Sequence, residues 1–245
     1  MIKIIHLYPD LMNLYGGSAD MDVLRLYLEA CGQKVEITHA EVGDRIDVAW
    51  ADLVYIGAGT EHKMLAAASD LERCRDDIRA YVEAGGNLLL TGNASVLACE
   101  KIKDLEGKEH KGLGLIGGHA EIGDYRHYSD VIGWINEKLG LCLGDDKSLR
   151  IIGATNSSHV AEFEAEPFLS RLDVDSNAYI GETEGFIYKN VIGTQVAAPL
   201  LARNPQFLRE YAERIAGEKL QAPEIRWLEE AELGYDYASG MMEGE

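Results

Sequence analysis

Short apolar segments alternate with longer amphipathic segments through the first part of the chain. Four segments have the pattern of strands, namely residues 2–7, 34–38, 52–56 and 88–90. Between them, residues 20–28 and 63–83 carry apolar side chains at helical spacing, and a glycine follows each stretch closely enough to end a helix. This alternation predicts an α/β fold, a doubly wound and mostly parallel sheet flanked by helices.

The second half of the chain has a different pattern. Short apolar stretches between Gly, Asn and Asp turns predict additional antiparallel strands, at residues 112–116, 131–135, 149–152 and 186–188. Asn204 and Pro205 open an amphipathic helix over residues 207–216. We expect one domain over residues 1–220, then an acidic C-terminal region over residues 221–245, with a helix at 224–233 and a frayed end.

The segment after residues 88–90 has the pattern of a catalytic elbow. Thr91, Gly92 and Asn93 form a tight turn, and residues 95–99 have the look of a helix beginning. Strand, glycine turn and helix is the geometry that lifts a nucleophile above a sheet edge and aims backbone N–H groups at an oxyanion. The residue at the tip should be Ser or Cys, whereas here it is Thr91.

A second glycine turn, from Gly57 to Gly59, follows the strand at residues 52–56. Ligands of doubly wound sheets bind at the carboxyl ends of the strands. The turns at Gly57 and Thr91 both lie at such ends, so we expect them to face one pocket.

Charge and composition exclude several classes of function. The 245 residues carry a net charge of −19, which argues against nucleic acid and anionic membranes as partners. Four scattered cysteines without a CxxC pair indicate neither a zinc site nor a disulfide framework. No apolar run approaches the roughly 18 residues of a membrane span, and the N-terminus does not have the pattern of a signal peptide. We therefore expect a cytoplasmic protein with no metal, no cofactor, no nucleic acid partner and no membrane insertion.

Several longer strings resemble one family in their order and spacing. They are HLYPDLMNLYGGSADMDVLRLYLEACG, DLVYIGAGTEHKM, NLLLTGNASVLA, KGLGLIGGHAE and GFIYKNVIGTQVAAPLLARNP. Together they resemble the GatD-type class I glutamine amidotransferases, which are related to the CobB/CobQ-like glutaminases, over residues 2–216. The resemblance implies a flavodoxin-like fold and a MurT-like Mur ligase as partner. In that family the glutaminase supplies ammonia for amidation of lipid II during peptidoglycan synthesis.

The family's chemistry requires a Cys at the elbow and a His after a late strand, which activates the thiol and protonates the leaving ammonia. At the matching positions this chain has Thr91 and Ala197. By the same resemblance Gly57 and Gly59 approach the oxyanion, Gly92 belongs to the elbow, and Arg126 holds the substrate glutamine. The paired substitution predicts an inactive glutaminase site.

Three functions remain open at this point. The first is a pseudo-glutaminase that docks or regulates a MurT-like ligase. The second is an active amidotransferase of the lipid II or cobyric acid type with a non-standard nucleophile. The third is a sensor that binds glutamine or another small amino acid through Arg126. Cys99 and His159 are the candidate replacements for the missing pair, although we expect Cys99 to be a core thiol and His159 a core or surface side chain.

Overall fold

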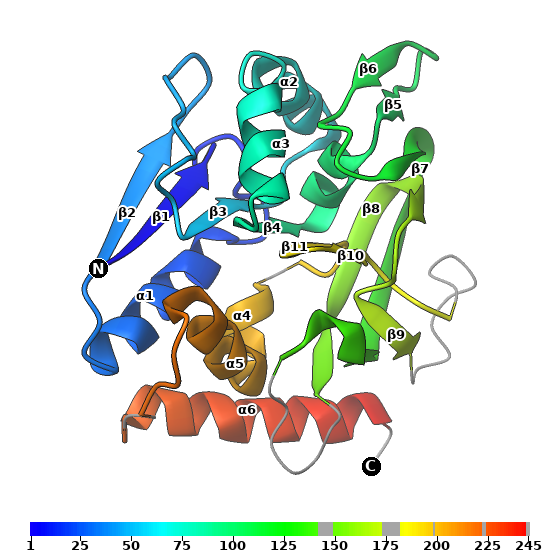
Figure 1. The fold of residues 1–245 in the computed structure, drawn as a ribbon. Coiled ribbons are helices and arrows are strands. Elements are labelled where there is room, and N and C mark those ends of the chain that lie inside the picture. Colours follow the sequence, from blue (N-terminus) through cyan, green and yellow to red (C-terminus); the bar gives the residue numbers. More distant parts are fainter. Residues whose placement is uncertain (142–148, 173–181, 198, 222–223, 244–245) are drawn as a thin grey trace.

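A six-stranded sheet forms the centre of the computed structural model, which describes residues 1–141, 149–172, 182–197, 199–221 and 224–243 (Figure 1). Its strands lie in the order β10-β11-β4-β3-β1-β2, and all pair in parallel except β10 with β11. The bounds are β1 Ile2–Leu7, β2 Val35–Ala40, β3 Leu53–Ile56, β4 Asn87–Thr91, β10 Phe186–Tyr188 and β11 Val191–Thr194. The predicted mostly parallel α/β sheet is confirmed.

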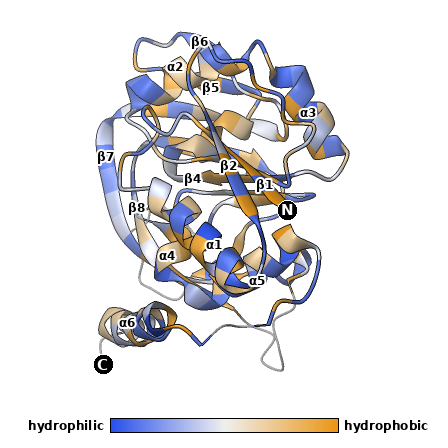
Figure 2. Cartoon of the chain, turned by 90° about the vertical axis from the view of Figure 1, so that its left-hand side faces the viewer, coloured by the Kyte–Doolittle hydropathy of each residue, from blue (hydrophilic) through white to orange (hydrophobic). Residues whose placement is uncertain are grey.

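Helices cover both faces of this sheet, because its central strands are apolar on both sides. Leu88 and Leu90 of β4 belong to the core under α2 (Glu61–Leu71) and α3 (Arg75–Glu83). Leu89 points the other way, into the core with α1 (Ser18–Ala30), α4 (Leu200–Arg203) and α5 (Pro205–Ala216). In Figure 2 these strands have the hydrophobic colours and the outer helix surfaces are mixed or hydrophilic. The uninterrupted apolar runs of the sequence therefore reflect burial on two faces.

A second, five-stranded sheet lies beside the first and consists mainly of one long antiparallel pair (Figure 1). Its strands are β5 Lys101–Lys103, β6 Glu109–Lys111, β7 Gly117–Ile135, β8 Arg150–Glu164 and β9 Leu169–Leu172. β7 pairs with β8 along most of its length, with a register shift between Ile122 and His127. The predicted strand at 131–135 is the end of β7, and the one at 149–152 is the start of β8. The predicted strand at 112–116 is wrong, since this segment is the irregular connection between β6 and β7.

Two other elements differ from the sequence-based expectation. The long helix predicted at 63–83 is two helices, with a break at residues 72–74. The helix expected at 95–99 is a 3-10 helix, η1 Gly92–Ala98, which begins directly at the elbow. A second 3-10 turn, η2, spans Glu137–Leu139.

The C-terminal region is more ordered than expected. α6 runs without interruption over Arg226–Glu243, so the expected fraying after residue 233 is wrong up to residue 243 (Figure 1). Gly244 lies outside the described residues. Tyr235 donates to the Arg150 carbonyl (3.0 Å) and Arg209 pairs with Glu232 (2.5 Å), which ties α6 to the body of the protein. A domain boundary at residue 220 remains a prediction. No helix in the described ranges is long and apolar enough to cross a bilayer.

Candidate functional site

The elbow lies at the carboxyl edge of the central sheet, where β4, β3 and β11 end side by side. Thr194 of β11 pairs with Thr91 of β4, and the loop after β11 carries Ala197 back across the elbow. Gly92, at the turn, has a φ of +61°. A Cβ at Gly92 would lie 2.6 Å from the Cβ of Ala58 and 3.4 Å from the Cβ of Ala197. The elbow therefore faces Ala197, and the two substituted regions lie next to each other in space.

Thr91 itself does not project into this space. It is the last residue of β4, in an extended conformation with φ −112° and ψ 148°. Its side chain is 2% exposed, and its hydroxyl lies 3.0 Å from the Tyr55 hydroxyl. A nucleophile elbow places its nucleophile on the strained residue of the turn, and the left-handed residue here is Gly92. We infer that Gly92, one residue later than the sequence indicates, marks the place where a nucleophile would stand.

The Thr91 hydroxyl belongs to a buried structural network below the elbow. Tyr55 donates to the Gly17 carbonyl (3.0 Å) and lies 3.4 Å from Asp20 Oδ2. Asp20 in turn accepts the backbone N–H groups of Leu200 (3.1 Å) and Leu201 (2.6 Å). Burial raises the pKa of Asp20 to about 7, although these hydrogen bonds favour its charged form. The network joins α1 to the start of α4 and places no base beside Thr91.

The glycine turn at residues 57–59 is hydrogen-bonded to a side chain of the elbow, that of Asn93. Asn93, which is 6% exposed, accepts the Gly59 N–H with its carboxamide oxygen (2.9 Å) and donates to the Gly59 carbonyl (2.8 Å). The backbone donor expected for an oxyanion is therefore already bonded. A Cβ at Gly57 would lie 2.6 Å from the Met12 carbonyl oxygen, and one at Gly59 would overlap the Met12 sulfur. Both glycines are thus required by the packing of the loop after β1.

Arg126 also binds a group of the chain itself. Its guanidinium donates to both carboxylate oxygens of Glu61, at 2.9 and 3.1 Å, and to the Asn156 amide oxygen at 3.2 Å. Ser158 donates to the same carboxylate (2.9 Å). Glu61 stands in the first turn of α2, where the helix dipole favours a negative charge. The Arg126 guanidinium, to which the resemblance assigns the binding of substrate glutamine, therefore binds a carboxylate of the chain itself.

Neither candidate replacement completes a catalytic pair. Cys99 is fully buried, and burial raises the pKa of its thiol to about 12, so it carries no thiolate at neutral pH. His159 is 3% exposed, and burial lowers its pKa to about 4. His159 lines a cavity whose lining does not include the elbow turn. In the part of the chain that the structure describes, no three His, Cys, Asp or Glu side chains are grouped to hold a metal ion.

Two residues that shape the site were missed from the sequence. In the sequence analysis Asn93 is only part of the elbow turn, and Glu61 is only one letter of the string DLVYIGAGTEHKM. For Glu61 the available signal was its place two residues after Gly59, at the start of a helix. Its pairing with Arg126 joins residues 65 positions apart, so sequence spacing does not reveal it.

The sequence of this chain matches a known protein family and two curated relatives. Residues 3–205 match the CobB/CobQ-like glutamine amidotransferase domain. The GatD subunit of lipid II isoglutaminyl synthase (glutamine-hydrolyzing) from Streptococcus pneumoniae is 23% identical, over 97% of this chain and 90% of that protein. The subunit of the same name from Staphylococcus aureus is 22% identical, over 83% of this chain and 79% of that protein.

Solved structures agree with the fold. The structure of PurLQS from Thermotoga maritima superposes with a TM-score of 0.53 and 13% identity, covering 96% of this chain and 98% of that chain. A glutamine amidotransferase from Thermotoga maritima superposes with a TM-score of 0.51 and 14% identity, covering 98% and 94%. At this identity the likeness concerns the fold alone. With its family match over most of the sequence, the chain belongs to the CobB/CobQ-like glutamine amidotransferases, and the resemblance to the GatD type is confirmed.

Proposed function

We propose that this chain is a GatD-like subunit of a lipid II amidating enzyme that does not hydrolyse glutamine itself. In this proposal it docks or regulates a MurT-like Mur ligase in the cytoplasm, and free ammonia serves as nitrogen donor. The relatives named as GatD subunits support the pathway. The observation that carries the loss of activity is the elbow, where the atoms nearest to a side chain at Gly92 belong to Ala58 and Ala197 and not to a base.

The size of the expected loss follows from how such sites work. Removing one member of a nucleophile–base unit lowers the rate by about 10³–10⁶, and the losses overlap because the members act together. Here both members are missing, and the Thr91 hydroxyl is hydrogen-bonded below the sheet. The Gly59 N–H, which would stabilise an oxyanion, is bonded to Asn93. The other hydroxyl of the elbow, that of Ser95, donates to the Gly92 carbonyl (2.8 Å), so both elbow hydroxyls are bonded within the chain, which weighs against the active-enzyme alternative.

The same contacts weigh against the sensor alternative. Glutamine presents a carboxamide at one end and a carboxylate at the other. At this sheet edge the Asn93 carboxamide binds Gly59, and the Glu61 carboxylate binds Arg126. The places where the carboxamide and the carboxylate of glutamine would bind are therefore taken by a carboxamide and a carboxylate of the chain itself. A free amino acid would have to displace them, which favours a structural role for this edge.

The outer face of α6 supports the docking part of the proposal. Leu233, Tyr237 and Met241 follow each other at helical spacing and are 70%, 73% and 61% exposed. Exposed acidic side chains, Glu229 and Asp236 among them, flank this stripe. Figure 2 shows α6 at the edge of the molecule. The stripe fits a partner surface that is apolar and rimmed by basic side chains.

Ammonia release from glutamine tests the loss of activity. The full chain is assayed alone and after co-purification with its Mur ligase partner, and no release is expected in either case. Turnover that disappears on Thr91→Ala would overturn the proposal and restore the alternative of a non-standard nucleophile.

Association with the ligase tests docking separately. We expect Leu233→Asp and Tyr237→Asp each to weaken co-purification of the partner. Leu105→Asp, at a side chain that is 58% exposed far from α6 in sequence, serves as the matched control. Equal retention of the partner by all three variants would exclude α6 as the docking face.

A further inference from the structure

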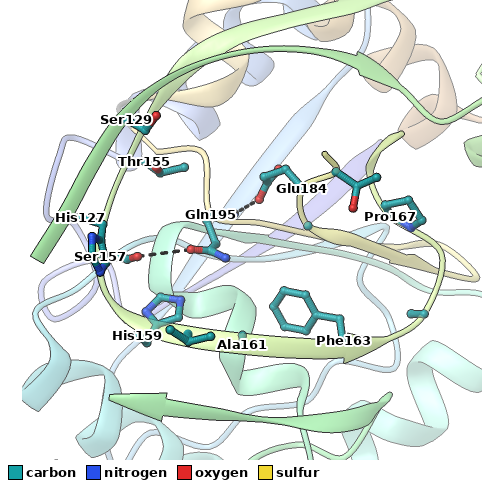
Figure 3. Close-up of a pocket in the computed structure, with 14 residues that line it drawn as sticks. His127, Ser129, Thr155, Ser157, His159, Ala161, Phe163, Pro167, Glu184 and Gln195 are labelled. Atoms are coloured by element: carbon teal, nitrogen blue, oxygen red, sulfur yellow. Dashed lines mark hydrogen bonds between the residues drawn. The ribbon is translucent and has the colours of Figure 1, made fainter. Parts of the chain in front are cut away.

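A second polar site lies on the other face of β8 from the Arg126–Glu61 pair. Along β8, Asn156 and Ser158 contact that pair, whereas Ser157 and His159 line a cavity of about 250 Å³. This division follows from the alternation of side chains along a strand. Figure 3 shows the cavity between β8 and the loop that carries Gln195, with His159 and Glu184 on opposite sides of Gln195.

His159 is a buried polar group whose ring nitrogens are left unpaired by the described part of the chain. Its side chain points into the cavity, and among the residues that the structure describes neither ring nitrogen has a hydrogen-bond partner (Figure 3). A buried donor or acceptor left unpaired costs about 1–3 kcal/mol, so native structures rarely keep one unless something satisfies it. Because the imidazole is neutral at physiological pH, it offers one donor and one acceptor. A molecule that satisfies it must carry both an acceptor and a donor, as a hydroxyl does.

Glu184 gives the cavity its charge. The side chain is 3% exposed and accepts the Thr194 hydroxyl (2.6 Å) and the Gln195 N–H (2.5 Å), one at each oxygen. Each oxygen retains a further acceptor site. The described lining contains no Lys or Arg, so no side chain of these two kinds balances the carboxylate from within the cavity. Burial raises the pKa of Glu184 to about 7, so the carboxyl is only partly ionised near neutral pH, and a cation bound beside it favours the ionised form.

The remaining walls limit the size and polarity of a ligand. Hydroxyl groups of Ser129, Thr155 and Ser157 lie on the polar side, and Ala161, Phe163 and Pro167 form an apolar side. An anion would meet Glu184 without any opposing charge. A positively charged amine would meet a carboxylate, several hydroxyl oxygens and the acceptor nitrogen of His159.

We propose that this cavity binds a small hydroxyl-bearing primary amine in its protonated form. The ammonium group lies at Glu184, the hydroxyl lies at His159, and the short carbon body rests on the side formed by Phe163 and Pro167. This assignment is independent of the proposed function, because the cavity lining includes none of Gly59, Gly92, Arg126 or Ala197.

Three probes of similar size test the assignment on the full chain: ethanolamine, the neutral ethylene glycol and the anionic glycolate. NMR of ¹³C-labelled histidine reports binding at His159, whose resonances are assigned by their loss in His159→Gln. We expect ethanolamine to shift the His159 resonances, ethylene glycol to bind about tenfold more weakly, and glycolate to leave them unchanged.

A variant pair locates the charge that selects the amine. Glu184→Gln is expected to weaken ethanolamine binding about tenfold and to leave ethylene glycol binding unchanged. Glu162→Gln, on the same strand as His159 but exposed, is the matched control and should bind like the unaltered chain. Glycolate binding as tightly as ethanolamine, or no shift of His159 by any probe, would overturn the proposal. The ranking of the three probes on the unaltered chain decides the question even where Glu184→Gln folds poorly.

Discussion

The elbow edge of the central sheet and the cavity beside β8 treat buried polar groups in opposite ways. At the elbow, Asn93 and Thr91 each have a partner from the chain itself. In the cavity, neither nitrogen of His159 has a hydrogen-bond partner within the described ranges. Polar groups that are satisfied internally stabilise a fold, whereas unpaired ones lower its stability and are kept where they bind something. The elbow edge, which resembles a catalytic site, therefore has the contacts of a structural region. The cavity beside β8, which has no resemblance to a known site, has the unpaired group expected of a binding site.

The largest expected effect comes from rebuilding the catalytic pair. We expect Ala58→Gly/Gly92→Cys/Ala197→His/Asn93→Gly to release ammonia from glutamine at least about 10³-fold faster than the unaltered chain. Gly92→Cys places the thiol opposite the new His. Ala58→Gly removes the Cβ that would lie 2.6 Å from the new one, and Asn93→Gly frees the Gly59 N–H. Ammonia release is the measurement.

The matched control carries the thiol one residue earlier, as Ala58→Gly/Thr91→Cys/Ala197→His/Asn93→Gly. It should stay inactive, because the Thr91 side chain points below the sheet towards Tyr55. Activity of the control instead of the Gly92 variant would move the nucleophile position back to Thr91.

A pH dependence of stability sharpens the description of the cavity. The folded state holds the pKa of His159 at about 4, below its usual value of about 6.5, because burial disfavours the charged ring. The stability that follows from the neutral ring is complete above pH 6.5 and is lost as the pH falls towards 4. Between pH 7 and 4.5 we expect the free energy of unfolding to fall by about 2–3 kcal/mol more in the unaltered chain than in His159→Gln.

Urea unfolding at the two pH values measures this difference. The other buried groups, Asp20, Glu184 and His6, are present in both proteins, so their contributions cancel to first order. His119→Gln is the control, because the side chain of His119 is 58% exposed. An identical pH dependence of the unaltered chain and His159→Gln would show that His159 is not held neutral.

Asn93→Ala tests whether the elbow edge is structural. The substitution removes two hydrogen bonds and leaves the N–H and carbonyl of Gly59 without their partner. We expect a loss of about 2 kcal/mol in the free energy of unfolding, measured by urea denaturation at pH 7. Asn156→Ala, which removes a hydrogen bond to the exposed Arg126, should cost less than about 0.5 kcal/mol. Equal values for both variants would mean that Asn93 does not hold the edge together.

The sequence predicts the central sheet better than the second sheet for a physical reason. Residues 88–90 are apolar because both faces of β4 are buried, and such a run is visible locally. β7 is 19 residues long, and its exposed and buried positions change along its length, so only its apolar end at 131–135 had the pattern of a strand. The connection at 112–116 is apolar because Leu113 and Ile116 pack into the core, although its backbone does not pair as a strand.

The candidate site was predictable in its location but not in its contents. The glycine turns indicated correctly which strand ends meet. The tip of the elbow required a backbone angle, since only the φ of +61° distinguishes Gly92 from Thr91 as the strained residue. The internal partners of Arg126 and Gly59 required the fold, because these contacts join elements far apart in sequence.

The smallest expected effect is the contribution of the Arg126–Glu61 pair to stability. Both carboxylate oxygens of Glu61 accept from the same Nη2 of Arg126. The Arg126 side chain is 45% exposed and that of Glu61 is 22% exposed, so water and salt screen the pair. A double-mutant cycle with Arg126→Ala and Glu61→Ala should give a coupling energy of about 0.5–1 kcal/mol that decreases with added salt. Ser158→Ala, which removes only the hydroxyl bonded to Glu61, controls for the neighbouring hydrogen bond. A coupling above about 2 kcal/mol would show that the pair behaves as a buried one. Glutamine binding gives a further test of the same pair. In the unaltered chain glutamine should leave the thermal unfolding midpoint unchanged, because Glu61 already binds the Arg126 guanidinium. In Glu61→Ala the guanidinium is open to an added carboxylate, so a rise of the midpoint with glutamine would show that Glu61 is what prevents an amino acid from binding at this edge.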